Sequence, residues 1–185
     1  YFAFNKIELV RGEQYRLINF SDINLGEIDF DIPKTSNLEI KKRLDKTILI
    51  LSSDSGSSYL NSDGTPLDKI SSEMGMLLVQ QNTTLIPIEA EEITSSKKGS
   101  EYRGRTLPLM KVISKNEKDK LINVYLNVYS GEVTAIRSMQ WKIWDLMWGF
   151  HIMDWQERDN IDNLFLKIFS ILALVSSITG ILLFF

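Results

Sequence analysis

The 185-residue sequence contains no cysteine and only one histidine. Without cysteine there can be no disulfide framework, thiol nucleophile or thiolate metal site. The sequence also lacks a Gly-rich phosphate loop and a Gly-x-Ser-x-Gly motif. A net charge of −3 gives no reason to expect nucleic acid as a partner. We therefore predict no catalytic residue and no metal site, and the chain is not expected to be a stand-alone enzyme.

Charge is almost absent from the C-terminal end. Residues 164–185 contain one charged residue, Lys167, and the run from Ile168 to Phe185 contains none. As a helix, 164–185 would span about 33 Å, against about 30 Å for the hydrocarbon core of a bilayer. A domain of this size cannot enclose a helix that is apolar on every face. We therefore predict a transmembrane helix at 164–185, with the lipid bilayer as a partner.

Two features add detail to this anchor. Ser176 and Gly180 form a small-xxx-small pair, which allows a second helix to approach closely. The ordinary tolerance of small residues in membranes accounts for the pair equally well. The preceding segment, 154–162, holds four acids and one arginine. Because positive charge marks the cytoplasmic side, this acidic flank favours a soluble domain outside the cytoplasm.

The rest of the chain contains one pattern twice: strand, polar turn, strand, tight glycine turn and strand. The tight turns carry Asp63-Gly64 and Ser130-Gly131, where glycine supplies the positive φ of a hairpin. We predict two three-stranded antiparallel meanders in tandem repeats, at about 37–69 and 71–137. Their predicted strands are 47–51, 59–61, 65–67, 107–113, 122–126 and 132–136.

A helix is predicted before each meander. Residues 37–44 form a short candidate helix. Residues 71–81 carry three apolar side chains at helical spacing, with Ser71 or Ser72 as N-cap, and are expected to pack on the second meander. Residues 5–137 are therefore predicted to form an α+β domain.

All four tryptophans lie between Met139 and Trp155. Tryptophan is enriched where a membrane meets water, but the charges in this segment make it a poor span. We predict an interfacial helix and loop at 138–163, lying at the bilayer surface. Five residues spaced 3, 4, 3 and 4 apart should form one stripe on it: Trp141, Trp144, Trp148, His151 and Trp155.

His151 allows two interpretations. As the only histidine it is a candidate haem ligand, and haem is the one cofactor that the sequence suggests. One imidazole cannot form a bis-histidine site alone, so a second ligand would have to come from elsewhere. If His151 is such a ligand, Asp154 is a candidate acceptor for its second ring nitrogen. Alternatively, the ring lies at the interface and bonds a backbone carbonyl or one of the nearby acids. Both interpretations remain open at this point.

Residues 101–105 place two arginines beside a glycine. Such a loop is able to hold an anionic headgroup. Charges of this kind are more often solvated in a loop, and we expect that here.

Two segments resemble PepSY-domain proteins. Leu107–Val112 followed by Val124–Val133 resembles the core hairpin of a PepSY domain, with Asn127 where aspartate is usual. Trp141–Asp154 looks like the segment before the last helix of PepSY-associated transmembrane proteins, and Ser177–Gly180 is similar to part of that helix. The resemblance covers about 95–185 well, and residues 1–94 only through the repeat pattern.

The resemblance implies an arrangement and several functions. Two-helix members of the family carry a first membrane helix, and residues 1–4 would be its end. The PepSY-like domain would then face the periplasm from the bacterial inner membrane. The implied function is a non-catalytic accessory subunit that binds other membrane subunits. A haem-binding electron-transfer or ferric-siderophore reductase component using His151 is the alternative, and a peptidase regulator is the second alternative.

Overall fold

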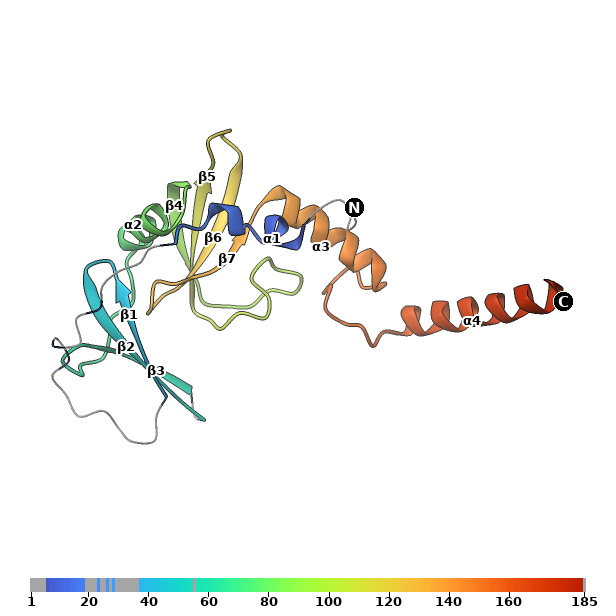
Figure 1. Cartoon of the computed structure of the whole chain (residues 1–185), viewed down its shortest axis with the longest axis horizontal. Helices are drawn as coiled ribbons and strands as arrows, with labels where there is room; N and C mark the ends of the chain where they lie inside the picture. Colours follow the sequence, from blue (N-terminus) through green and yellow to red (C-terminus); the bar gives the residue numbers. More distant parts are fainter. Residues whose placement is uncertain are drawn as a thin grey trace.

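The computed structural model describes residues 6–18, 23, 26, 28, 37–54 and 56–184. They form two antiparallel sheets with short helices around them and one long C-terminal helix (Figure 1). The fold is therefore α+β, as predicted. The predicted membrane segment at residues 1–4 lies outside the described residues.

The described elements give the chain its order. One sheet has the order β1-β2-β3 and the other β4-β5-β6-β7, and all neighbouring strands are antiparallel. Each sheet is therefore a meander. The elements are α1 (Ile7–Val10), the 3-10 helix η1 (Glu13–Tyr15), β1 (Asn37–Arg43), β2 (Lys46–Ser53), β3 (Gly56–Asn61), α2 (Ser72–Asn82), β4 (Ile86–Ile93), β5 (Leu109–Lys115), β6 (Leu121–Asn127), β7 (Val133–Arg137), α3 (Met139–His151) and α4 (Leu164–Phe184).

The first sheet corrects two predictions. Residues 37–44 were predicted as a helix, but β1 pairs with β2 along its whole length. Its lysines, glutamate and leucine favour helix by propensity, and pairing with the apolar strand β2 overrides that preference. The predicted third strand at 65–67 is only an isolated bridge between Leu60 and Pro66. Proline has no N–H to extend a ladder beside β3. The third strand is instead β1, on the other side of β2.

The second sheet confirms the predicted meander and adds a strand. Strands β5, β6 and β7 match the predicted strands, and Gly131 has φ 73° in the turn before β7. The added strand is β4, at the edge next to β5. The sequence pattern did not predict this strand, because Pro87 and three glutamates interrupt the apolar alternation. An edge strand, however, tolerates proline and exposes its charges.

Helix α2 covers one face of this sheet, as predicted. The hydroxyl of Ser71 caps it by accepting the N–H of Met74 at 3.2 Å. Leu78 and Val79 belong to the same buried hydrophobic cluster as Val124 and Leu126 of β6. Gly75 brings the helix close to the sheet, since a Cβ there would lie 3.0 Å from Met110. This layer holds the main hydrophobic core.

The other face of the sheet is covered by the loop between β4 and β5. Tyr102 of that loop packs on Leu109, Tyr125 and Ala135. The rings of Tyr102 and Tyr125 lie 5.7 Å apart. This loop contains 101–105, so it brings their charges to the side of the sheet away from α2.

Side chains of the first sheet contact the turn before β7. Arg43 of β1 donates to the carbonyls of Asp68 and Tyr129, both at 2.9 Å. Tyr59 of β3 stacks on Tyr129 with ring centroids 5.1 Å apart. The hydroxyl of Tyr59 also accepts from Asn127 at 3.0 Å. The turn before β7 therefore connects the first sheet to the second.

The N-terminal segment lies along the second sheet. Gly12 has φ 81°, and a Cβ there would lie 2.7 Å from Ile136 of β7. Val10 is fully buried beside it. This close approach places α1 between β7 and α3 (Figure 1).

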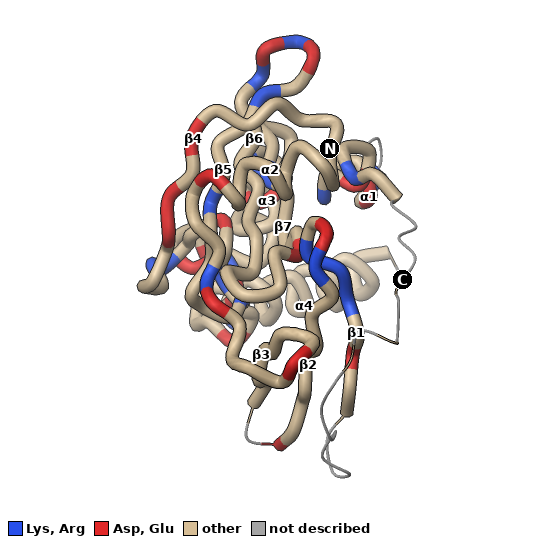
Figure 2. Tube along the Cα trace, turned by 90° about the vertical axis from the view of Figure 1, so that its left-hand side faces the viewer, with Lys and Arg blue, Asp and Glu red and all other residues tan. Residues whose placement is uncertain are grey.

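The C-terminal helix α4 has no buried residue. It is 21 residues long with a mean hydropathy of 2.1, so its length and composition suffice to cross a membrane. In Figure 1 it runs away from the sheets. Charged residues are instead interspersed along the strands and loops (Figure 2). The predicted helix at 164–185 is thus one continuous helix over its described residues.

Candidate functional site: the tryptophan helix and the arginine cavity

Helix α3 starts immediately after β7. The Ser138 hydroxyl caps it by accepting the N–H of Trp141 at 3.3 Å. The helix ends at His151, four residues short of Trp155. Met153 has a positive φ of 56°, and the N–H of Asp154 returns to the carbonyl of Gly149 at 2.9 Å. This turn ends the helix, so the predicted stripe loses its last member.

The last three tryptophans have two different environments. Trp144 stacks on Trp148 with ring centroids 5.9 Å apart, and Trp148 lies 5.8 Å from the ring of His151. Trp155 instead packs edge-on against Phe150 and Phe165, at 6.4 and 6.0 Å. It therefore belongs to an apolar contact between the end of α3 and the start of α4.

Trp141 faces the domain. It is 7% exposed, and the guanidinium of Arg137 lies 4.3 Å from its ring centroid. The guanidinium of Arg103 lies 5.7 Å from the same ring. Cations over a tryptophan face are attracted by the ring, most strongly where water is excluded. Trp141 therefore packs against two arginines inside the domain and is not exposed at a bilayer surface.

Asp145, one turn further along α3, is completely buried. Its carboxylate accepts from Arg158 at 2.6 Å and also pairs with Arg103. Arg103 holds Asp159 as well, at 2.9 Å. A buried carboxylate is tolerated only when it is paired and hydrogen-bonded, so this cluster fixes α3 to the loop at 101–105 and to the loop before α4.

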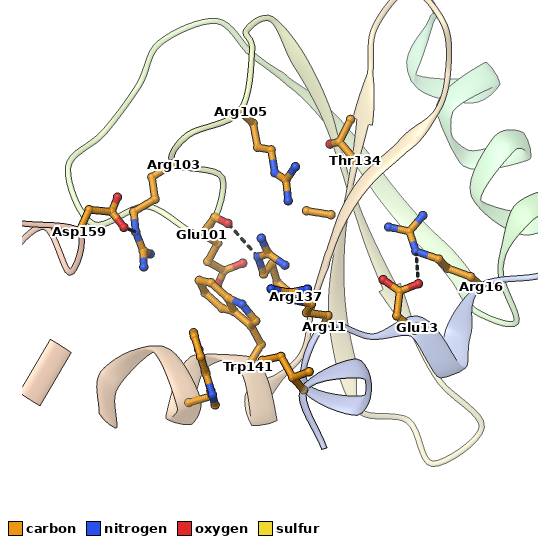
Figure 3. A pocket seen from close by; sticks show the side chains of 13 residues that line it. Arg11, Glu13, Arg16, Glu101, Arg103, Arg105, Thr134, Arg137, Trp141 and Asp159 are labelled. Carbon is orange, nitrogen blue, oxygen red and sulfur yellow. Dashed lines mark hydrogen bonds and ion pairs between the residues drawn. The ribbon is translucent and has the colours of Figure 1, made fainter. Parts of the chain in front are cut away.

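A cavity of about 470 Å³ opens beside this cluster (Figure 3). Its walls are α1 and η1, β7, the loop at 101–105 and the first turns of α3. Trp141 and Trp144 form an aromatic wall. We call it the arginine cavity because five arginines line it: Arg11, Arg16, Arg103, Arg105 and Arg137.

Arg137 is the buried member of this group, 9% exposed. Its Nε donates to the carbonyl of Glu101 at 2.9 Å. Burial lowers the pKa of Arg137 to about 10, and the like charge of Arg105 acts in the same direction. The guanidinium is still protonated at neutral pH. A buried cation with a cationic neighbour makes the cavity strongly electropositive.

The carboxylate of Glu101 bonds other residues, and its charge opposes the lowering of the Arg137 pKa. It pairs with Lys142 at 2.9 Å and accepts from Asn123 at 2.7 Å and from Tyr125 at 3.0 Å. Burial, together with the charge of Glu101, raises the pKa of Tyr125, which therefore stays protonated as a donor.

The loop at 101–105 therefore differs from the expected set of solvated charges. Arg105 is exposed, as expected. Arg103, by contrast, has only 16% of its side chain exposed and is ion-paired, while Glu101 is 21% exposed. Neither side chain is a solvated loop charge, because α3 packs over both. One feature of the sequence pointed to this ion pair: Asp145 lies in the middle of a tryptophan-rich helix. It did not show that Arg103 and Arg158 are the partners of Asp145.

The opposite side of α3 is apolar and exposed. Four residues at spacings of 4, 3 and 4 form this exposed α3 face: Met139, Ile143, Leu146 and Phe150. Their exposed fractions run from 40 to 64%. Apolar side chains at this spacing share one side of a helix. The surface best suited to an apolar partner is therefore this face and not the tryptophan stripe.

His151 lies exposed at the end of α3. Within the described residues, no group of three or more His, Cys, Asp or Glu is placed to hold a metal ion. The two oxygens of Asp154 accept four backbone N–H groups of the following loop, from residues 156, 157, 159 and 160. Burial acts in the opposite direction, but these bonds hold the pKa of Asp154 below its usual value.

The Ser176 and Gly180 pair of α4 is open to its surroundings. Nothing in the described structure lies within 4 Å of a Cβ built on Gly180, and Ser176 is exposed one turn earlier. The pair thus leaves room on α4 for another helix, as a small-xxx-small motif requires.

Comparison of the chain with family models, curated proteins and solved structures finds no match.

Proposed function

We propose that the chain is a membrane-anchored, PepSY-like accessory subunit without catalytic activity. Its domain would face the periplasm from the bacterial inner membrane and bind other membrane subunits. The observation that carries the proposal is α4, a helix long enough to span a bilayer with no residue buried against the domain. A helix of this kind needs lipid or another membrane helix around it.

Two further observations support the proposal. Helix α2 precedes a sheet that contains the meander β5-β6-β7 with a glycine turn at Gly131, which is what the PepSY-like pattern would require, and β4 is an additional edge strand. The exposed α3 face lies on the helix that directly precedes α4 in the chain. Trp155 packs on Phe150 of α3 and on Phe165 of α4, and so links the two helices. An apolar face next to a membrane helix suits contact with a neighbouring membrane subunit.

The test begins with the anchor. Deleting residues 164–185 should release the chain from membranes washed with alkaline carbonate, whereas the full chain should stay in the pellet. The full chain, extracted in mild detergent, should migrate on native gels in a complex larger than itself. Retention of the truncated chain in the pellet would contradict α4 as the anchor, and migration as a monomer would contradict the accessory role.

Substitutions on α3 locate the contact. Changing Ile143 and Leu146 to glutamate should dissociate the complex, because both side chains are exposed and apolar on α3. The matched control changes Ile88 and Leu121 to glutamate. These residues are also exposed and apolar, but they lie on the second sheet. Equal loss in both variants would contradict a contact through α3.

A haem-binding role through His151 is the second candidate. Its support is the exposed position of the ring at the end of α3, a short loop before the membrane helix. A bound haem would supply one-electron chemistry, and this chain would contribute one imidazole ligand. The purified full-length complex should then show a Soret band that shifts with dithionite and is lost in His151→Ala. A complex without such a band would exclude the role.

A further inference from the structure

Three guanidinium groups of the arginine cavity have no carboxylate partner within the described residues. These are Arg11, Arg105 and Arg137, and Figure 3 shows them on neighbouring walls of the cavity. Arg137 donates to backbone carbonyls only, which leaves its charge without a direct counterion. Arg11 and Arg105 are exposed at the rim.

The carboxylates of the cavity are already engaged. Glu13 pairs with Arg16 at 3.0 Å, Glu101 pairs with Lys142, and Asp159 pairs with Arg103. Five arginines against three carboxylates give the lining an excess positive charge. The rim arginines are therefore free to receive an anion from outside the chain.

We propose that the arginine cavity binds a phosphate group. Several guanidinium groups converge on one space, and a phosphate has enough acceptor oxygens to bond more than one of them in bidentate fashion. A single carboxylate accepts one such fork and would leave the remaining cations unpaired. A bound dianion would also offset the buried charge of Arg137, next to which Arg105 places a second positive charge.

The walls define what accompanies the phosphate. Trp144 gives one side a partly exposed aromatic surface, against which the organic part of a phosphate ester can pack, whereas the ring of Trp141 is already covered by Arg137. The volume of about 470 Å³ exceeds that needed for a bare ion and falls in the range of small-molecule sites. The phosphate can belong to a soluble phosphate compound or to the headgroup of an anionic lipid. This assignment goes beyond the accessory role and does not depend on it.

The experiment uses the purified full chain in neutral detergent micelles. Inorganic phosphate is titrated by isothermal calorimetry, with tryptophan fluorescence as a second readout because Trp141 lines the cavity. Arg105→Gln and Arg11→Gln should each weaken phosphate binding by about tenfold, since each removes one charge-assisted fork. Lys46→Gln removes the same charge from an exposed position at the start of β2, and should leave binding unchanged.

Two further titrations separate the outcomes. Acetate should bind more weakly than phosphate, because it cannot satisfy several forks. Short-chain phosphatidylglycerol in the same micelles should displace inorganic phosphate if a lipid headgroup is the source, and should fail to do so if the source is soluble. The proposal is overturned if phosphate does not bind saturably, if acetate binds as tightly, or if the rim variants behave like Lys46→Gln. Unfolding curves that match the wild type will show that the rim variants are folded.

Discussion

The domain before α4 and the helix α4 differ in how far their side chains are buried by the rest of the chain. In the domain, charged groups such as Asp145 and Arg137 are buried and held by several partners, and glycines allow backbone and side chains to approach closely. In α4 no residue is buried, and a Cβ built on Gly180 meets nothing. The domain is thus stabilised by contacts within the chain, whereas the surface of α4 is left open to its surroundings. Substitutions of the same kind should therefore have different effects in the two regions.

The largest effect is expected at Asp145. Asp145→Ala leaves Arg103 and Arg158 without their shared buried counterion, so it should destabilise the domain by about 3–5 kcal/mol. The matched control is Asp162→Ala, whose side chain is 80% exposed and pairs with Lys167 next to the start of α4. That change should stay within about 0.5 kcal/mol. Urea unfolding followed by tryptophan fluorescence measures both, because α4 has no tryptophan. Similar losses in the two variants would contradict the buried role of Asp145.

A pair of glycines gives the next largest difference. Gly131→Val forces a β-branched residue to φ 73° and places its Cβ 2.7 Å from Leu78 of α2. We expect a loss of about 2 kcal/mol in the free energy of unfolding. Gly180→Val adds the same side chain in open space and should leave the domain unchanged. A domain equally sensitive to both changes would show that α4 packs against it.

The smallest effect is expected at Asp154, in the joint between the two regions. Asp154→Asn weakens four hydrogen bonds to backbone N–H groups, and solvent screening keeps the cost below about 1 kcal/mol. Limited proteolysis should cut the loop at 153–163 faster in the variant, with the sheets intact. Unchanged cleavage would show that the carboxylate does not order the loop.

The pH dependence of this joint follows from the lowered pKa of Asp154. Because the folded pKa lies below the unfolded value of about 3.9, the contribution of Asp154 is fully present above that value. It is lost only as the pH falls through the folded pKa. Proteolysis of the wild-type loop should therefore be constant around neutral pH and increase in acid. The Asp154→Asn variant should not show this carboxylate-dependent increase.

The sequence predicts best where the signal is local. The uncharged run predicts α4 because length and hydropathy decide membrane crossing without reference to other residues. Alternation and a glycine turn predict β5, β6 and β7 for the same reason. Strand β1 was missed because it forms a strand only by pairing with β2. Helix propensity considers each residue by itself and takes no account of such a partner. Strand β4 was missed because Pro87 and exposed glutamates are tolerated only at an edge, and the edge position is a property of the whole sheet.

The candidate site shows the same limit. The tryptophan spacing correctly predicted a helix, but it did not show which side faces the domain. That side is set by Arg103 and Arg158, which lie 42 and 13 residues from Asp145 in sequence. No short-range pattern connects these residues. The arginine cavity likewise gathers side chains from four separate parts of the chain, so only the folded structure brings its charges together.

The loop before α4 has a mechanical consequence. Its backbone is held at one end by Asp154. At the other end, the side chain of Asn163 accepts the N–H of Leu166 in the first turn of α4 and donates to the carbonyl of Ile152. Between these ends, Arg158 is attached to Asp145. A force on α4 is therefore transmitted to α3 through bonded side chains, and through the shared carboxylate of Asp145 it reaches Arg103 in the wall of the arginine cavity.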